Sequence, residues 1–224
     1  MRNAHSTLRE DLINAARYIK AKGLTPGHTG NVSIRVPGKS GASDDFKMLI
    51  TPTGLPYEHM LPEDLVLVAS DGTWPARGLK PSSEWQFHLA AFKANPEVNA
   101  LVHTHSNYAT TLACARKRIP AFHYMVAAAG GDSIPLVPYN VFGSEALSKG
   151  VAKAFANRKA CLMAHHGQLA GEKTIDKAVE LAEIVEDLAH QYWALLQIAE
   201  PKLLTKKQMT DVLEKFKTYG QQKP

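Results

Sequence analysis

The sequence has few cysteines and no long apolar run, and each absence excludes a class of protein. Only Cys114 and Cys161 are cysteines among its 224 residues, which excludes the disulfide framework of a small secreted domain. Both stand in apolar company, so we expect reduced, buried thiols that pack as small hydrophobic side chains. No stretch approaches the 18 consecutive apolar residues of a membrane span, and no apolar signal-peptide segment opens the chain. We therefore expect a cytoplasmic protein that binds no membrane.

Clustered basic charge is also lacking, although the formal net charge is +5. Lysines and arginines are scattered in twos and threes, with Arg116 to Arg118 as the longest run, and no aromatic residues interleave with them. This pattern argues against a nucleic-acid partner. A modest positive charge suits a small phosphorylated substrate instead.

The length and the periodicity of the apolar residues favour one domain over residues 1–224. Alternating or continuous apolar residues of strand length occur at 32–36, 48–51, 65–69, 98–102, 133–137 and 160–164. The first of these predicts a half-buried strand, the last a central strand, and Asp71-Gly72 a tight hairpin turn. Helical periodicity covers 8–20, 85–94, 107–115, 144–155, 178–199 and 209–216. Because strands and helices interleave irregularly, a layered α/β domain is favoured over a strictly parallel sheet.

The most informative stretch is Val102 to Ser106, which contains His103 and His105. Residues two apart on a strand project to the same face, so both imidazoles can reach one divalent cation. The pair His165-His166 follows another buried strand and offers a third imidazole. On a regular strand these two neighbours face opposite ways, so only one of them should bind, and the spacing does not choose between them.

Glu84 is a candidate carboxylate ligand at the start of the helix predicted for 85–94. It has an ordinary interpretation as a first-turn acid favoured by the helix dipole. It also has a functional interpretation as a metal ligand, a general base, or both. Zinc favours imidazole and carboxylate ligands, and a catalytic zinc site keeps an exchangeable position for substrate.

Three turns of small residues lie at Gly30-Asn31, Thr53-Gly54 and Ser82-Ser83. Each offers backbone N–H groups with short hydroxyl or amide donors, and the last stands at a predicted helix N-terminus, where an anion is favoured. Each taken alone is typical of an ordinary turn or cap. Three such turns beside a metal site indicate a phosphate pocket.

Six ordered motifs, spread over nearly the whole chain, together resemble the class II aldolase/adducin family. The motifs are His28-Thr29-Gly30-Asn31-Val32-Ser33, Ile50-Thr51-Pro52-Thr53-Gly54, Lys80-Pro81-Ser82-Ser83-Glu84-Trp85, Val102-His103-Thr104-His105, Ile119-Pro120-Ala121-Phe122-His123-Tyr124 and His165-His166-Gly167. The resemblance implies a single α/β domain with a central mixed, mainly antiparallel sheet flanked by helices. It also implies that a C-terminal tail, about residues 205–224, contributes to the active site.

The resemblance assigns roles to residues that the spacing left open. It implies one zinc ion per subunit with ligands Glu84, His103, His105 and His166, and a substrate phosphate held by Gly30, Asn31, Thr53, Gly54, Ser82 and Ser83. Glu84 would leave the metal and act as the base, while Tyr124 and Tyr219 would act near the aldehyde. The family forms homotetramers with active sites at subunit interfaces, so the tyrosines are expected to act within one subunit or across an interface.

The activity that the resemblance implies is metal-dependent cleavage of a ketose 1-phosphate, with L-fuculose 1-phosphate as the expected substrate. The products would be dihydroxyacetone phosphate and L-lactaldehyde. A related 4-epimerase is disfavoured because such enzymes resemble a version with Asp in place of Glu84. A ribulose-phosphate aldolase, a dehydratase and a decarboxylase stay open as related activities, and a non-catalytic adducin-like binding module is the remaining possibility. The module is disfavoured because all four ligand positions are occupied by ligating residues.

Overall fold

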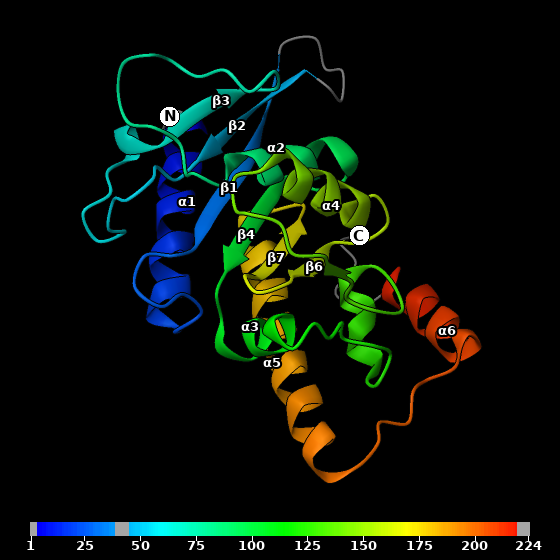
Figure 1. Ribbon diagram of the computed structural model, residues 1–224. Helices are drawn as coiled ribbons and strands as arrows, with labels where there is room; N and C mark the ends of the chain where they lie inside the picture. The colour runs from blue at the N-terminus through cyan, green and yellow to red at the C-terminus, as the bar shows by residue number, and fades with distance from the viewer. Residues whose placement is uncertain (1–3, 39–44, 219–224) are drawn as a thin grey trace.

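One seven-stranded sheet organises the computed structural model, which describes residues 4–38 and 45–218. The strands are β1 (Asn31–Pro37), β2 (Phe46–Ile50), β3 (Val66–Ala69), β4 (Ala100–Thr104), β5 (Leu136–Val137), β6 (Ala160–Met163) and β7 (Gly167–Glu172). Their order across the sheet is β3-β2-β1-β4-β7-β6-β5, and Figure 1 labels all of them except β5. Neighbouring strands are antiparallel except β5 and β6, which run parallel. The predicted α/β fold with a mixed, mainly antiparallel sheet is confirmed.

Helices cover both faces of this sheet. They are α1 (Ala4–Ala21), α2 (Trp85–Ala94), α3 (Asn107–Cys114), α4 (Glu145–Phe155), α5 (Ile175–Ile198) and α6 (Lys206–Phe216), with short 3₁₀ helices η1 (Pro62–Asp64) and η2 (Tyr124–Ala129). Figure 1 shows α2 and α4 side by side over one face, while α1, α3 and α5 pack on the other. α6 packs against η2. None of the helices within the described ranges is long and apolar enough to cross a lipid bilayer.

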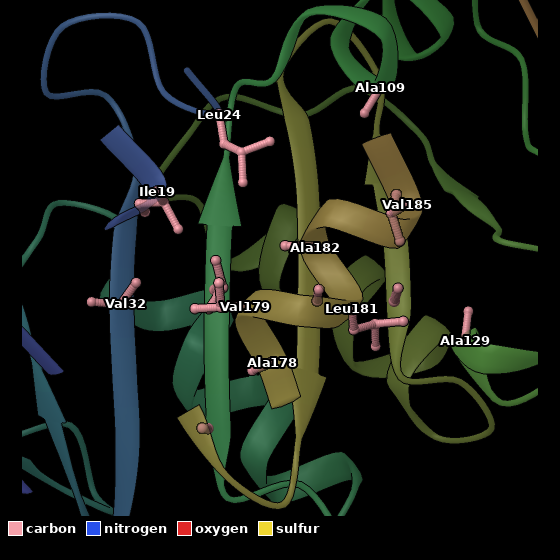
Figure 2. Close-up of a cluster of buried hydrophobic side chains, with 14 of the residues drawn as sticks. Ile19, Leu24, Val32, Ala109, Ala129, Ala178, Val179, Leu181, Ala182 and Val185 are labelled. Carbon is pink, nitrogen blue, oxygen red and sulfur yellow. The ribbon is translucent and has the colours of Figure 1, made fainter. Parts of the chain in front are cut away.

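Strand alternation divides the buried side chains between two cores. Ala100 and Val102 of β4 belong to the core under α1, α3 and α5, whereas Leu101 belongs to the core under α2 and α4. Figure 2 shows the first core, where Val32 of β1 lies among side chains that include Ile19 of α1. Because side chains alternate along a strand, odd-numbered residues of β4 face α2.

The long helix predicted from its three- and four-residue steps is α5, and the prediction is confirmed. Its first turn is capped by Thr174, whose side chain accepts a hydrogen bond from the Lys177 N–H. The stripe that includes Ala178, Leu181 and Val185 is buried against β4 and β7. Helical propensity and burial agree here, which explains why the sequence pattern alone predicts this element.

Several local predictions were wrong, and burial explains most of them. β7 was missed, because its glycines and small residues have weak strand propensity and pairing on both sides compensates for it. The predicted strand at 133–137 is reduced to β5. The strand predicted at 160–164 is β6, which is buried and paired on both sides, as predicted, and lies second from the edge. The chain turns at Asp71-Gly72, but no strand follows, so the expected hairpin does not form. β1 is buried on both faces, including its polar residues Ser33 and Arg35.

The two cysteines differ in exposure, contrary to the prediction that both are buried. Cys161 lies within β6 and is fully buried, and burial raises the pKa of its thiol to about 12. Cys114, the last residue of α3, is exposed. Apolar neighbours in sequence did not imply burial for Cys114, because a helix turns successive residues to different sides.

Candidate metal centre

The sheet topology brings the predicted metal ligands to one place. β1 and β4 are antiparallel with Asn31 opposite His103, so the start of one strand meets the end of the other. The turn that carries His166 leads directly into β7, which pairs with β4 on its other side. Glu84 is the N-cap residue of α2, which covers this face of the sheet. His105 lies one residue past the end of β4.

The ligand atoms of these four residues lie within 4.8 Å of one another. Glu84 Oε1 is 2.8 Å from His166 Nε2, and its Oε2 is 3.2 Å from His103 Nε2. His103 Nε2 and His105 Nε2 are 3.0 Å apart. The three imidazole rings meet pairwise at 71–75° with centroids 4.8–4.9 Å apart. Three imidazole nitrogens and a carboxylate therefore converge on one point.

The protonation of His103 fits a cation at that point. Its Nδ1 lies 2.7 Å from the Gln168 carbonyl oxygen, which accepts only, so Nδ1 carries the proton. Nε2 then faces the cluster, which is the usual arrangement of a metal-binding histidine. His103 is fully buried, so solvent does not satisfy this nitrogen. The donor set of this site can hold a divalent cation.

The electrostatics of the cluster also favour a charged Glu84 carboxylate and a neutral His105 ring. Burial alone would raise the pKa of Glu84, but His103 and His166 outweigh it and hold that pKa far below its usual range. Burial, together with His103 and His166, lowers the pKa of His105 to about 3 against the opposing effect of Glu84. Neutral imidazole and ionised carboxylate are the forms that ligate metals.

The turn between β6 and β7 determines which of His165 and His166 reaches the metal cluster. Residues 164–166 connect β6 and β7 and are not part of a strand, so the expectation that the two side chains face opposite ways does not apply. His165 has a left-handed backbone with φ 56°, and its Nε2 accepts a hydrogen bond from Arg116 Nε at 3.3 Å. His166 alone of the pair belongs to the four-residue cluster.

A cavity of about 380 Å³ opens beside the cluster, and small residues form part of its lining. All six residues predicted to hold a phosphate line it: Gly30, Asn31, Thr53, Gly54, Ser82 and Ser83. The turns meet because the Thr53 N–H donates to the Lys80 carbonyl at 3.1 Å and the Ser82 N–H donates to the Thr51 carbonyl at 3.0 Å. The Asn31 side-chain amide is already engaged, since its Nδ2 donates to Glu84 Oε2 at 2.9 Å.

The predicted tyrosines are placed differently. Tyr124 begins η2, is about half exposed and lines a separate groove with α6 residues, among them Val212 and Phe216. It does not line the cavity beside the cluster in its own chain. Tyr219 lies outside the described residues, as does the rest of the predicted tail beyond residue 218.

Sequence reasoning missed several residues around the site. The cavity is also lined by Tyr139, Asn140 and Phe142 of the loop before α4, for which the sequence carries no signal of function. The sequence pattern assigns His88 only to the apolar stripe of α2. It is fully buried and linked to Asn31 by a hydrogen bond. Its position four residues after Glu84, on the same helix face, was the signal that could have identified it.

Comparison with known proteins identifies the class to which this fold and site belong. The family model described as "Class II Aldolase and Adducin N-terminal domain" matches residues 10–193. The chain therefore belongs to the class II aldolase and adducin family, and it is a class II aldolase, a lyase.

Individual relatives match almost from end to end. The chain is 48% identical over 221 residues to "5-methylthioribulose-1-phosphate/5-deoxyribulose-1-phosphate aldolase" from Rhodospirillum rubrum, covering 98% of this chain and 96% of that protein. It is 44% identical over 214 residues to "L-fuculose phosphate aldolase" from Escherichia coli strain K12, covering 95% of each. A solved "L-fuculose 1-phosphate aldolase" has a TM-score of 0.87 at 33% identity, covering 96% of this chain and 100% of that one.

Proposed function

We propose that the chain is a zinc-dependent aldolase that cleaves L-fuculose 1-phosphate to dihydroxyacetone phosphate and L-lactaldehyde. The observation that carries this proposal is a single cavity lined by members of the Glu-His₃ cluster and by a cradle of small residues. A ketose 1-phosphate carries its phosphate on C1 and its ketone on the adjacent carbon, C2. A cation site and a phosphate cradle in one cavity are complementary to those two neighbouring groups.

The residues of the cluster would hold one zinc ion per subunit. The chemistry supplied by that cation is Lewis-acid stabilisation of the negative charge that develops on the ketone oxygen, worth several kcal/mol. Glu84, His103, His105 and His166 would be the ligands. The phosphate cradle would anchor the substrate through the backbone N–H groups of Gly30 and Gly54 and the hydroxyls of Thr53, Ser82 and Ser83, with Asn31 beside them.

Proton transfer would be the work of Glu84 and two tyrosines. In cleavage Tyr124, acting as the phenolate, would take the proton of the C4 hydroxyl as the C3–C4 bond breaks to release the aldehyde. The electron pair of that bond stays at C3, which would take a proton from Glu84 in its protonated form. Proton exchange with water would return both side chains to their starting forms, so the net change is one proton moved from the C4 oxygen to C3. The two carboxylate oxygens of Glu84 have different partners, His166 for Oε1 and both His103 and Asn31 for Oε2, so Glu84 could leave the metal while keeping the hydrogen bond from Asn31.

The position of Tyr124 favours a homotetramer with active sites at subunit interfaces. Because Tyr124 lines a groove away from the cavity of its own chain, the proposal has it act in the cavity of a neighbouring subunit. Tyr219, three residues after the end of α6, would assist there or close the site as part of the tail at 205–224.

A second candidate substrate is 5-deoxyribulose 1-phosphate or its 5-methylthio analogue, because the relative from Rhodospirillum rubrum is named for both. Cleavage between C3 and C4 would again release dihydroxyacetone phosphate, now with a two-carbon aldehyde or its methylthio derivative. These aldehydes differ at the end remote from the phosphate, where small pocket differences are worth about 1–3 kcal/mol of discrimination.

The experiment that tests the proposed function is a coupled assay for dihydroxyacetone phosphate. L-fuculose, L-rhamnulose, D- and L-ribulose, 5-deoxyribulose and 5-methylthioribulose 1-phosphates would be compared at equal zinc loading. We expect L-fuculose 1-phosphate to have the highest kcat/KM. Release of dihydroxyacetone phosphate from none of them would overturn the aldolase proposal and favour an epimerase, dehydratase or decarboxylase. Absence of bound zinc would favour a binding module.

The phosphate cradle has its own test in Ser83→Asp. Ser83 is exposed at the cavity wall, so the substitution should fold, but it places a carboxylate beside the substrate phosphate. Like charges in contact disfavour binding, and we expect KM to rise about 10- to 100-fold with a smaller change in kcat. The control, Asn157→Asp, makes a similar charge change at an exposed residue that does not line the cavity. Equal KM values for the two variants would place the phosphate elsewhere.

A further inference from the structure

A chain of buried polar side chains extends from Glu84 away from the cavity. Asn31 Nδ2 is 2.9 Å from Glu84 Oε2, the Asn31 Oδ1 is hydrogen bonded to His88 Nε2, and His88 Nδ1 is 2.8 Å from Ser33 Oγ. Ser33 and His88 are fully buried, and Asn31 and Glu84 are 4% and 6% exposed. Four linked polar groups that are buried are costly unless every partner is satisfied, so their arrangement is informative.

The geometry of one strand and one helix produces this chain. Asn31 and Ser33 are two residues apart on β1, so they lie on one face about 7 Å apart. Glu84 and His88 are four residues apart at the start of α2, so they lie on one helix face about 6 Å apart along the axis. The spacing of the two strand residues nearly matches that of the two helix residues. Asn31 therefore lies beside Glu84, and Ser33 lies beside His88.

Every hydrogen bond in this chain has only one possible direction. Glu84 is ionised and accepts, so the Asn31 Nδ2 donates, which leaves Asn31 Oδ1 facing His88 as an acceptor. His88 must then carry its proton on Nε2. Its Nδ1 is the acceptor for the Ser33 hydroxyl. Burial, with a contribution from His103, lowers the pKa of His88 to about 3 against the effect of Glu84, consistent with this neutral ring.

We infer that His88 is a positioning residue that acts through Asn31 to hold Glu84 in its place at the metal centre. This rests on the proposed function only in taking Glu84 as a metal ligand. The Nε2–H of His88 determines which end of the Asn31 amide faces Glu84. Without that donor the amide can turn over and present its oxygen to the carboxylate, which repels it. Glu84 then loses a hydrogen bond and a fixed orientation.

The test compares His88→Leu with His88→Gln in zinc affinity, measured by competition with a chromophoric chelator. Leucine removes the donor, while the glutamine amide can supply an N–H close to the position of Nε2. Outer-shell substitutions typically cost 10- to 100-fold in metal affinity. We expect a loss in that range for His88→Leu, with most of the affinity restored in His88→Gln. The visible spectrum of bound Co²⁺ should change in His88→Leu, because the position of the carboxylate ligand changes.

The control for general destabilisation is Phe92→Leu, a fully buried residue of α2 one turn further along and in the same core. It should lower the Tm while leaving zinc affinity at the wild-type value. Equal zinc affinity of His88→Leu and wild type, with a Tm loss like that of Phe92→Leu, would overturn the inference and leave His88 a core residue. Neither readout uses catalysis, so an enzyme that bound zinc but cleaved no sugar phosphate would refute the proposed function alone.

A measurement on the unmodified protein keeps the inference testable if His88→Leu does not fold. Nitrogen NMR of the imidazole rings distinguishes a protonated from an unprotonated ring nitrogen. We expect His88 to be the Nε2–H tautomer. The Nδ1–H tautomer would overturn the inference, because Nε2 would then be an acceptor facing the Asn31 oxygen.

Discussion

Substitution of Glu84 by glutamine is expected to reduce kcat about 10²- to 10⁴-fold, the usual contribution of a general acid–base group. Glutamine has nearly the same shape, and its amide oxygen can still accept from Asn31 Nδ2, so the backbone around α2 should not change. What it removes is the charge and the ability to exchange a proton with the carbon next to the ketone. Zinc should remain bound, more weakly, because the three imidazoles remain. Release of dihydroxyacetone phosphate and the zinc content per chain would be measured together.

The matched control for this substitution is Glu145→Gln, which makes the same chemical change on the surface. Glu145 lies in the first turn of α4, is 80% exposed and, among the described residues, forms an ion pair with Lys149 alone, at 2.7 Å. Exposed pairs of this kind contribute little, so kcat and zinc content should equal those of the wild type. A Glu84→Gln enzyme that kept its rate within about tenfold of the wild type would refute the role of Glu84 as the base.

Removal of the metal is expected to abolish activity completely and reversibly. Dialysis against EDTA should give an inactive protein, and added Zn²⁺ should restore it. The apo protein should also have a lower Tm, because a ligand that binds only the folded state stabilises it by about 2.7 kcal/mol at 100 times its Kd. Activity, zinc content and the Tm would be followed on the same samples. EDTA already saturated with zinc is the control and should change none of them.

The same experiment separates this mechanism from one that uses a lysine Schiff base. Among the described residues that line the cavity there is no lysine. Borohydride added together with substrate should therefore leave the enzyme active, because no imine forms to be reduced. Activity that survived in chelator, or substrate-dependent inactivation by borohydride, would each contradict the metal mechanism.

Local sequence pattern predicts some of the metal ligands but not all of them. The two-residue spacing of His103 and His105 is a local property of an extended segment, and it indicates a common target without knowledge of any long-range contact. The ambiguity between His165 and His166 could not be removed in the same way. It depended on residues 164–166 being a turn and on the strained backbone of His165, and both follow from the pairing of β6 with β7.

The polar face of β1 is a second feature that local sequence pattern predicts only in part. Alternation at 32–36 predicts a strand with a solvent-facing polar side, and the strand itself is confirmed. Its polar side is buried, because α2 covers it and supplies His88 as a partner for Ser33. A polar residue on a strand does not reveal whether water or a buried hydrogen-bonding group lies opposite.

The sequence by itself determined the elements with strong periodicity, the α/β class, the candidate ligand types and, through its ordered motifs, the family. These are local or cumulative properties of the chain, so no knowledge of contacts was needed. Only the tertiary structure decided that Glu84 reaches His103 and His166, that three separate turns line one cavity, and that Tyr124 faces another groove. Those facts depend on which strands pair and which helix covers which face. They are long-range consequences of burying two cores around one sheet, and no short stretch of sequence encodes them.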